Sequence, residues 1–129
     1  MTISIKANPG VWFEIPVSDM QRAIRFYETA FGTKMQSTEV NGMPLAFFPM
    51  EYEAMGVSGA LIHSPPVTPS HHGTTIYFHV ESINPMLGQI EAAGGKTLIP
   101  RRDIGQYGFF AQFEDSEGNR IGLHEMPQG

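Results

Sequence analysis

Hydrophobic and polar residues alternate at the start of the chain and then change to a helical spacing. Residues 11–17 read VWFEIPV, in which every second side chain is apolar, the period of a β-strand. The apolar residues that follow are spaced by three and four: Met20, Ala23, Ile24, Tyr27 and Phe31. This spacing predicts an amphipathic helix, with Ser18 and Asp19 as candidate caps and Gly32 as its end.

The same order of patterns returns 63 residues later. Residues 74–80 alternate again, and residues 83–93 repeat the helical spacing before Gly94 and Gly95. At this offset Val17 aligns with Val80, and Gly32 aligns with Gly95. A repeated order of strand, cap, helix and glycine indicates two copies of one structural unit.

Three further strands are predicted after each helix. They are residues 34–40, 44–50 and 57–64, then 96–101, 108–114 and 119–126. Asn41 and Gly42 mark a tight hairpin turn between the first two of these. We therefore predict an α+β fold of two βαβββ units, at about 11–64 and 74–126, joined by a Pro-rich linker at 65–73 within one domain spanning 1–129.

Composition narrows the classes of partner. The chain has no cysteine, which excludes disulfides and thiolate metal sites and fits a cytoplasmic protein. The net charge is −5 and the few Lys and Arg residues are scattered, so we expect no nucleic-acid partner. No apolar stretch is long enough to span a membrane, and the first ten residues lack the apolar region of a signal peptide.

The repeated plan, together with the segments FYETAFG, AAGGK and EDSEGNRIGLHEM, resembles the vicinal oxygen chelate superfamily. This superfamily includes glyoxalase I, bleomycin-resistance proteins and extradiol dioxygenases, and the resemblance covers residues 11–126. It implies that the two units curl into a cupped, partly open barrel of mixed sheet around a cavity. It also implies a homodimer.

The resemblance places metal ligands on the first and fourth strands of each unit, at positions that correspond here to Trp12, Thr75 and Gly122. The fourth strand of the first unit, within 57–62, has no carboxylate or imidazole. Indole, a lone hydroxyl and glycine do not supply the ligands that a divalent metal needs. We therefore predict that the usual metal site is absent and that the protein needs no cofactor.

Three polar residues lie two positions beyond the vacated ones and are predicted to point into the cup: Glu14, Tyr77 and His124. A carboxylate beside an imidazole is suited to acid–base catalysis, so we name Glu14 and His124 as candidate catalytic residues. Two alternatives stay open. The pair could be a buried structural ion pair, or Glu14 and His124 could join His63 or His79 in a displaced metal site.

Five residues are predicted to contact a small-molecule substrate: Trp12, Tyr77, Thr75, Phe48 and Arg101. We expect a glyoxalase-like protein that binds a small organic molecule in the cup, with metal-independent lyase or isomerase chemistry as one version of this function. The first alternative is a ligand-sequestering protein without catalysis, and the second is a metal-dependent lyase or dioxygenase. The sequence leaves open whether the protein is an enzyme.

Overall fold

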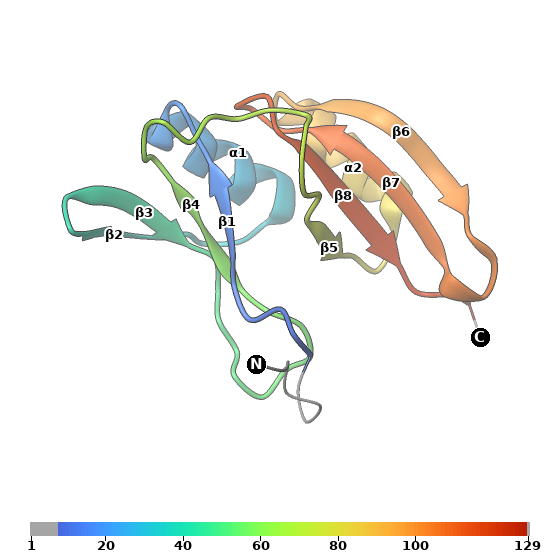
Figure 1. Cartoon of the computed structure of the whole chain (residues 1–129). Coiled ribbons are helices and arrows are strands. Elements are labelled where there is room, and N and C mark those ends of the chain that lie inside the picture. The colour runs from blue at the N-terminus through green and yellow to red at the C-terminus, as the bar shows by residue number, and fades with distance from the viewer. Residues whose placement is uncertain (1–7, 129) are drawn as a thin grey trace.

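The computed structural model describes residues 8–128, which form two βαβββ units (Figure 1). The first unit contains β1 (Phe13–Pro16), α1 (Met20–Phe31), β2 (Gln36–Val40), β3 (Met43–Phe47) and β4 (Gly59–Ile62). The second contains β5 (Tyr77–His79), α2 (Ile83–Ala92), β6 (Lys96–Asp103), the 3-10 turn η1 (Gly105–Tyr107), β7 (Phe109–Glu114) and β8 (Arg120–Glu125). The predicted α+β class and the order of elements are confirmed.

Each unit builds one mixed four-stranded sheet, in the orders β1-β4-β3-β2 and β5-β8-β7-β6. The first strand of each unit pairs in parallel with the fourth, and the other neighbours are antiparallel. Within the described residues no ladder joins the two sheets, so the barrel remains open. Figure 1 shows the sheets side by side, with the segment between β4 and β5 running from one to the other.

Both helices cover one face of the sheets, and a single hydrophobic cluster connects the two units there. It contains Ile15 and Tyr27 from the first unit together with Phe113 and Leu123 from the second, all almost fully buried. Burial of this apolar surface is the main stabilising contribution to the fold. We call the opposite face of the sheets, which no helix covers, the cup face.

The buried side of α1 is wider than its sequence pattern predicts. Phe26 lies outside the predicted stripe, yet it is only 2% exposed, and its ring centroid lies 6.2 Å from that of Phe113. The reason is that α1 packs on the second unit as well as on its own sheet. The apolar stripe in the sequence predicts the helix face that packs on its own sheet, and it does not predict a second contact surface.

A carboxylate caps the N-terminus of each helix, and only for α1 does it belong to a predicted cap residue. Asp19, rather than Ser18, is the N-cap of α1, since its Oδ1 accepts the amide N–H of Arg22 at 3.0 Å. The Ser82 side chain makes no cap bond to α2. Instead, Glu125 accepts the amide N–H of Ile83 at 2.9 Å from the end of β8, a long-range cap that local sequence cannot reveal.

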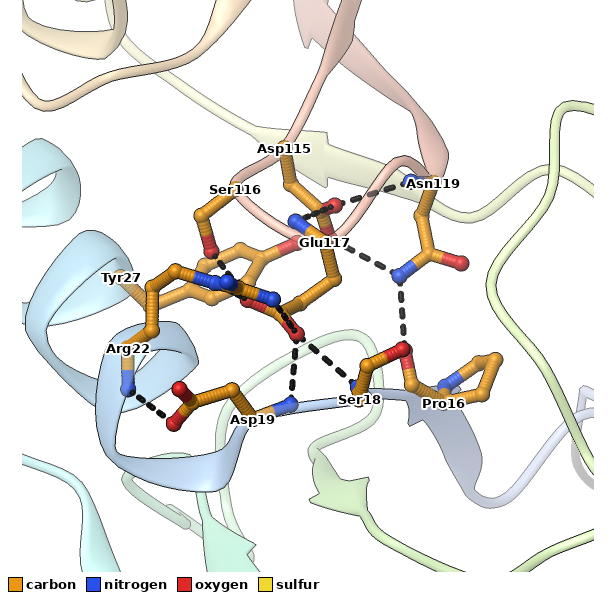
Figure 2. Close-up of polar contacts among 9 residues, drawn as sticks. All are labelled: Pro16, Ser18, Asp19, Arg22, Tyr27, Asp115, Ser116, Glu117 and Asn119. Carbon is orange, nitrogen blue, oxygen red and sulfur yellow. Dashed lines mark hydrogen bonds and ion pairs between the residues drawn. The ribbon is translucent and has the colours of Figure 1, made fainter.

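The turn between β7 and β8, residues 115–119, binds the first unit through a carboxylate (Figure 2). Glu117 Oε1 accepts the amide N–H groups of Ser18 and Asp19 at 2.9 and 2.8 Å, and Arg22 Nε donates to Glu117 Oε2 at 2.7 Å. Burial alone would raise the pKa of Glu117, but the hydrogen bonds from Arg22 and from these amides outweigh it and lower that pKa to about 2. The carboxylate is therefore held ionised at the start of α1.

A second carboxylate of the same turn is buried. The Tyr27 hydroxyl donates to Asp115 Oδ2 at 2.7 Å, and Asp115 also accepts the amide N–H groups of Glu117 and Asn119. Asn119 Nδ2 donates to the carbonyl of Pro16 at 2.8 Å. Burial raises the pKa of Asp115 despite these bonds, and burial is also the first reason why the pKa of Tyr27 is raised. The turn thus fastens the second unit to β1 and α1 (Figure 2).

Neither helix in the described part of the chain has the length and apolar character needed to cross a membrane.

Candidate functional site

The positions that correspond to the superfamily's metal ligands hold side chains that do not fit a metal. The Trp12 ring packs edge-to-face on Phe47, with 5.8 Å between centroids. Thr75 Oγ1 accepts a hydrogen bond of 2.6 Å from Arg120 Nη2. A Cβ at Gly122 would overlap the ring of Tyr77, so this ring occupies the space in which a ligand side chain would stand. The residues present thus lack the donors for the usual site.

His124 lies on the cup face of the second unit, near the end of β8. Its neighbour Leu123 is fully buried in the core, so His124 projects from the opposite side of β8. One nitrogen, Nε2, lies 2.7 Å from the carbonyl oxygen of Tyr107 in η1. Because a carbonyl only accepts, Nε2 carries the proton, and neutral His124 keeps a free lone pair on Nδ1.

Two cavities meet at His124. One, of about 390 Å³, is lined by Tyr77, Ile104, Phe110 and His124. The other, of about 380 Å³, is lined by Met55, Gly56, His79, His124 and Met126. We call the first the aromatic pocket and the second the methionine pocket. Each is large enough for part of a drug-sized molecule, since such sites enclose roughly 300–1,000 Å³.

Tyr77 forms one wall of the aromatic pocket. Its hydroxyl accepts a hydrogen bond from Gln112 Nε2 at 2.9 Å, and its ring centroid lies 6.5 Å from that of Phe110. The Tyr77 side chain is 45% exposed, so one face of the ring is open to a ligand. Gly122 is required beneath it because only a residue without Cβ lets the ring approach the strand so closely.

Glu14 lies elsewhere. It is exposed on β1 and lines a smaller cavity of about 140 Å³ with His72, Asn119 and Arg120, between the two units. His124 does not line this cavity, and Glu14 does not line either of the two cavities at His124. Both candidate catalytic residues therefore stand on the cup face, but in separate cavities.

The residues of the alternative metal site, Glu14 and His124 with His63 or His79, are not brought together. Within residues 8–128, no three His, Asp or Glu side chains come close enough together to hold a metal ion. His63 and Glu14 therefore do not join His124 in such a group. His79 alone stays close to His124, because the two residues are paired across the parallel strands β5 and β8.

Phe48 and Arg101 were both predicted to contact substrate, but in the structure their side chains contact other residues of the protein. Phe48 is 8% exposed, and its ring centroid lies 5.4 Å from those of Tyr27 and Phe78 in the core. Arg101 donates to both oxygens of Glu125, at 3.1 and 3.0 Å. Hydrogen bonding to Glu125 raises the pKa of Arg101, so an anionic ligand at Arg101 would have to compete with this carboxylate.

Three residues that line the two pockets were not among those predicted to contact substrate: Ile104, Phe110 and Met126. The position of Phe110 could have been predicted from the alternation of its strand. In β7, Ala111 and Phe113 are buried in the core, and the alternation of a strand then places Phe110 on the cup face. Ile104 and Met126 lie beside strands rather than within them, where alternation gives no direction.

Two βαβββ units with a shared core and an open cup define a glyoxalase-like protein that lacks the usual metal ligands. The chain belongs to the Glyoxalase/Bleomycin resistance protein/Dioxygenase superfamily, whose sequence profile matches residues 11–123. It is 27% identical over 118 residues to a glyoxylase-like domain-containing protein from Didymella fabae, with 88% of this chain and 91% of that protein covered.

Solved structures show the same fold. TnmS3, an antibiotic binding protein from Streptomyces sp. CB03234, matches with a TM-score of 0.69 at 22% identity, over 95% of this chain and 98% of its own. A V278E mutant of glyoxalase I from Zea mays matches with a TM-score of 0.68 at 21% identity, over 91% of this chain. The present chain spans about half of that maize protein, 46% of its length.

Proposed function

We propose that the protein binds a small, largely apolar aromatic molecule in the aromatic pocket beside His124. The observation that carries this proposal is the composition of the pocket: Tyr77 and Phe110 supply aromatic walls, Ile104 an aliphatic one, and His124 a single polar group. Offset stacking on such rings adds about 0.5–1.5 kcal/mol to the burial of a planar ligand. The similarity of the fold to that of an antibiotic binding protein supports the binding of a small organic molecule.

The test is a titration with 8-anilinonaphthalene-1-sulfonate as a planar aromatic probe, followed by its displacement with a panel of aromatic antibiotics. Phe110→Ala should weaken probe binding at least about tenfold, because one wall of the pocket is lost. Tyr52→Ala is the matched control, since Tyr52 is an aromatic residue that is 89% exposed and does not line this pocket. Equal affinity of wild type and Phe110→Ala would refute binding in the aromatic pocket.

A metal-independent lyase or isomerase is the second candidate function. It is supported by His124, whose protonated Nε2 is held by the carbonyl of Tyr107 while Nδ1 remains free as a base. If the protein consumes its ligand, His124→Gln should abolish turnover with little change in affinity. Glu14→Gln should leave turnover nearly unchanged if His124 acts without Glu14. His124 is the stronger candidate because Glu14 lines a separate cavity.

We also propose that the protein is a homodimer. Every residue of the edge strand β2 is exposed, and Val40 in that strand is 43% exposed. Unpaired strand edges with apolar side chains favour pairing with another chain. Sedimentation equilibrium should give twice the chain mass of 14.3 kDa, and a concentration-independent monomer would contradict the proposal.

A further inference from the structure

We propose that the methionine pocket is a binding site for a soft monovalent cation, Cu(I), with His79, His124 and Met126 as ligands. This site is distinct from the superfamily's metal positions at Trp12, Thr75 and Gly122, and it does not depend on the aromatic pocket being a ligand site.

The two histidines are adjacent on one face of the sheet. His79 and His124 are register partners in the parallel strands β5 and β8, and the His124 carbonyl accepts the amide N–H of Val80 at 2.9 Å. Neighbouring strands lie about 4.8 Å apart. Leu123 belongs to the core cluster and Phe78 packs against it, so the two imidazoles, which follow these residues, both project to the cup face. Two imidazoles at this spacing can reach one ion between them.

His124 has the orientation of a metal ligand. Metal-bound histidines commonly donate their second ring N–H to a carbonyl or carboxylate, which fixes the tautomer and presents the other nitrogen to the metal. The bond of 2.7 Å from Nε2 of His124 to the Tyr107 carbonyl is such a contact. His79 is exposed, so its imidazole can adjust to the ion at little cost in packing.

The remaining lining residues determine the kind of metal. Met126 and Met55 line the same cavity as the two histidines, and no carboxylate lines it. Thioether sulfur is a soft ligand that selects Cu(I), whereas hard divalent ions prefer carboxylate and carbonyl oxygen. Met126 directly follows β8, two residues beyond His124, so it is placed close to the imidazoles by the chain itself. Two imidazoles and one thioether make a three-coordinate set for Cu(I).

The experiment is an anaerobic competition between the protein and bathocuproine disulfonate for Cu(I), with ascorbate as the reductant. We expect one equivalent of Cu(I) per chain. Met126→Leu should lower the affinity at least tenfold, because it removes the sulfur and keeps an apolar side chain of similar size. His79→Ala should lower it by a similar factor.

The matched controls are Met50→Leu and His63→Ala, since neither residue lines the methionine pocket. Both variants should keep wild-type affinity for Cu(I). Ag(I), a redox-inert substitute, should shift the methyl resonance of Met126 and the imidazole resonances of His79 and His124 in wild-type protein. This readout does not depend on any variant folding.

Three results would overturn the proposal. They are unchanged Cu(I) affinity in both Met126→Leu and His79→Ala, no Ag(I)-dependent shift at Met126, or displacement of Ag(I) by an equal concentration of Zn(II). Binding of the aromatic probe by Met126→Leu at wild-type affinity, with Cu(I) affinity reduced, would support a Cu(I) site that shares His124 with the aromatic pocket but depends on Met126.

Discussion

The turn at 115–119 and the loop at 48–58 occupy equivalent places in the two units, yet they differ in almost every physical property. At the 63-residue offset Asp115 aligns with Tyr52, and Glu117 aligns with Ala54. Asp115 is 3% exposed and hydrogen-bonded on several sides, whereas Tyr52 is 89% exposed. Figure 1 shows the loop between β3 and β4 extending away from the two helices.

The loop of the first unit is three residues longer than the turn of the second, because the paired residues Ala46 and Leu61 lie 15 positions apart, whereas their counterparts Ala111 and Leu123 lie 12 apart. β3 ends at Phe47, two residues before Pro49, which has no N–H for a strand ladder. β7 continues to Glu114, and the following turn is closed by the Asp115 carboxylate. The turn at 115–119 holds the two units together through its hydrogen bonds, whereas Met55 and Gly56 of the longer loop line the methionine pocket.

The largest expected effect is the loss of the buried carboxylate. Asp115→Ala should lower the free energy of unfolding by about 3 kcal/mol, because it leaves the buried Tyr27 hydroxyl and the Asn119 amide without an acceptor. Urea denaturation measures this change. Tyr52→Ala, in the exposed loop of the first unit, should change the free energy of unfolding by less than about 0.5 kcal/mol. If both variants lost a similar amount of unfolding free energy, the turn at 115–119 would not contribute more to stability than the loop at 48–58.

A smaller effect is expected from the charge on Glu117. Glu117→Gln should cost about 1–2 kcal/mol at pH 7, a discounted figure because its partner Arg22 is half exposed to solvent. The pKa of Glu117 is lowered from the usual 4.5 to about 2 in the folded protein. Its contribution is therefore complete above pH 4.5 and lost as the pH falls toward 2.

The comparison between wild type and Glu117→Gln across pH tests this assignment. The difference in unfolding free energy should be constant from about pH 6 to 8 and narrow below the unfolded-state pKa. Glu51→Gln serves as the control, since Glu51 is an exposed carboxylate in the loop of the first unit. A difference that does not vary with pH would show that Glu117 acts through packing rather than charge.

The smallest effect is expected in the loop itself. The double substitution Tyr52→Ser and Met55→Ser should change the free energy of unfolding by less than about 0.5 kcal/mol, since both side chains are at least 89% exposed. Hydrogen exchange gives a second measure. The amides of Glu117 and Asn119, both bonded to Asp115, should be protected, while those of residues 52–57 should exchange rapidly. Comparable protection of the amides in both segments would contradict the proposed difference in local stability between the turn and the loop.

Much of the fold was readable because it depends on local patterns. Alternation located β1, spacing by three and four located α1, and Gly32 ends that helix with a φ of +63° as expected. The Asn41-Gly42 turn also has positive φ at both residues, the geometry of a tight hairpin. Of the positions that the resemblance gave for metal ligands, Gly122 lies in β8, Trp12 directly precedes β1, and Thr75 lies two residues before β5.

The candidate site was readable only in part. The resemblance and strand alternation together placed Tyr77 and His124 in the cup, and both residues line the aromatic pocket. The same rule placed Glu14 on the cup face, but it could not show that a separate cavity surrounds Glu14. Distance across a cup depends on how two sheets are inclined, and side-chain alternation carries no information about that angle.

The sequence by itself determined which residues form strands and helices, and which strand face each side chain occupies, because these properties depend on neighbours a few residues away. Only the tertiary structure decided the partners: Arg101 with Glu125, Glu117 with the start of α1, and His124 with the Tyr107 carbonyl. Each of these contacts joins residues far apart in the chain. Their formation follows from the packing of two units on one core, which no local pattern encodes.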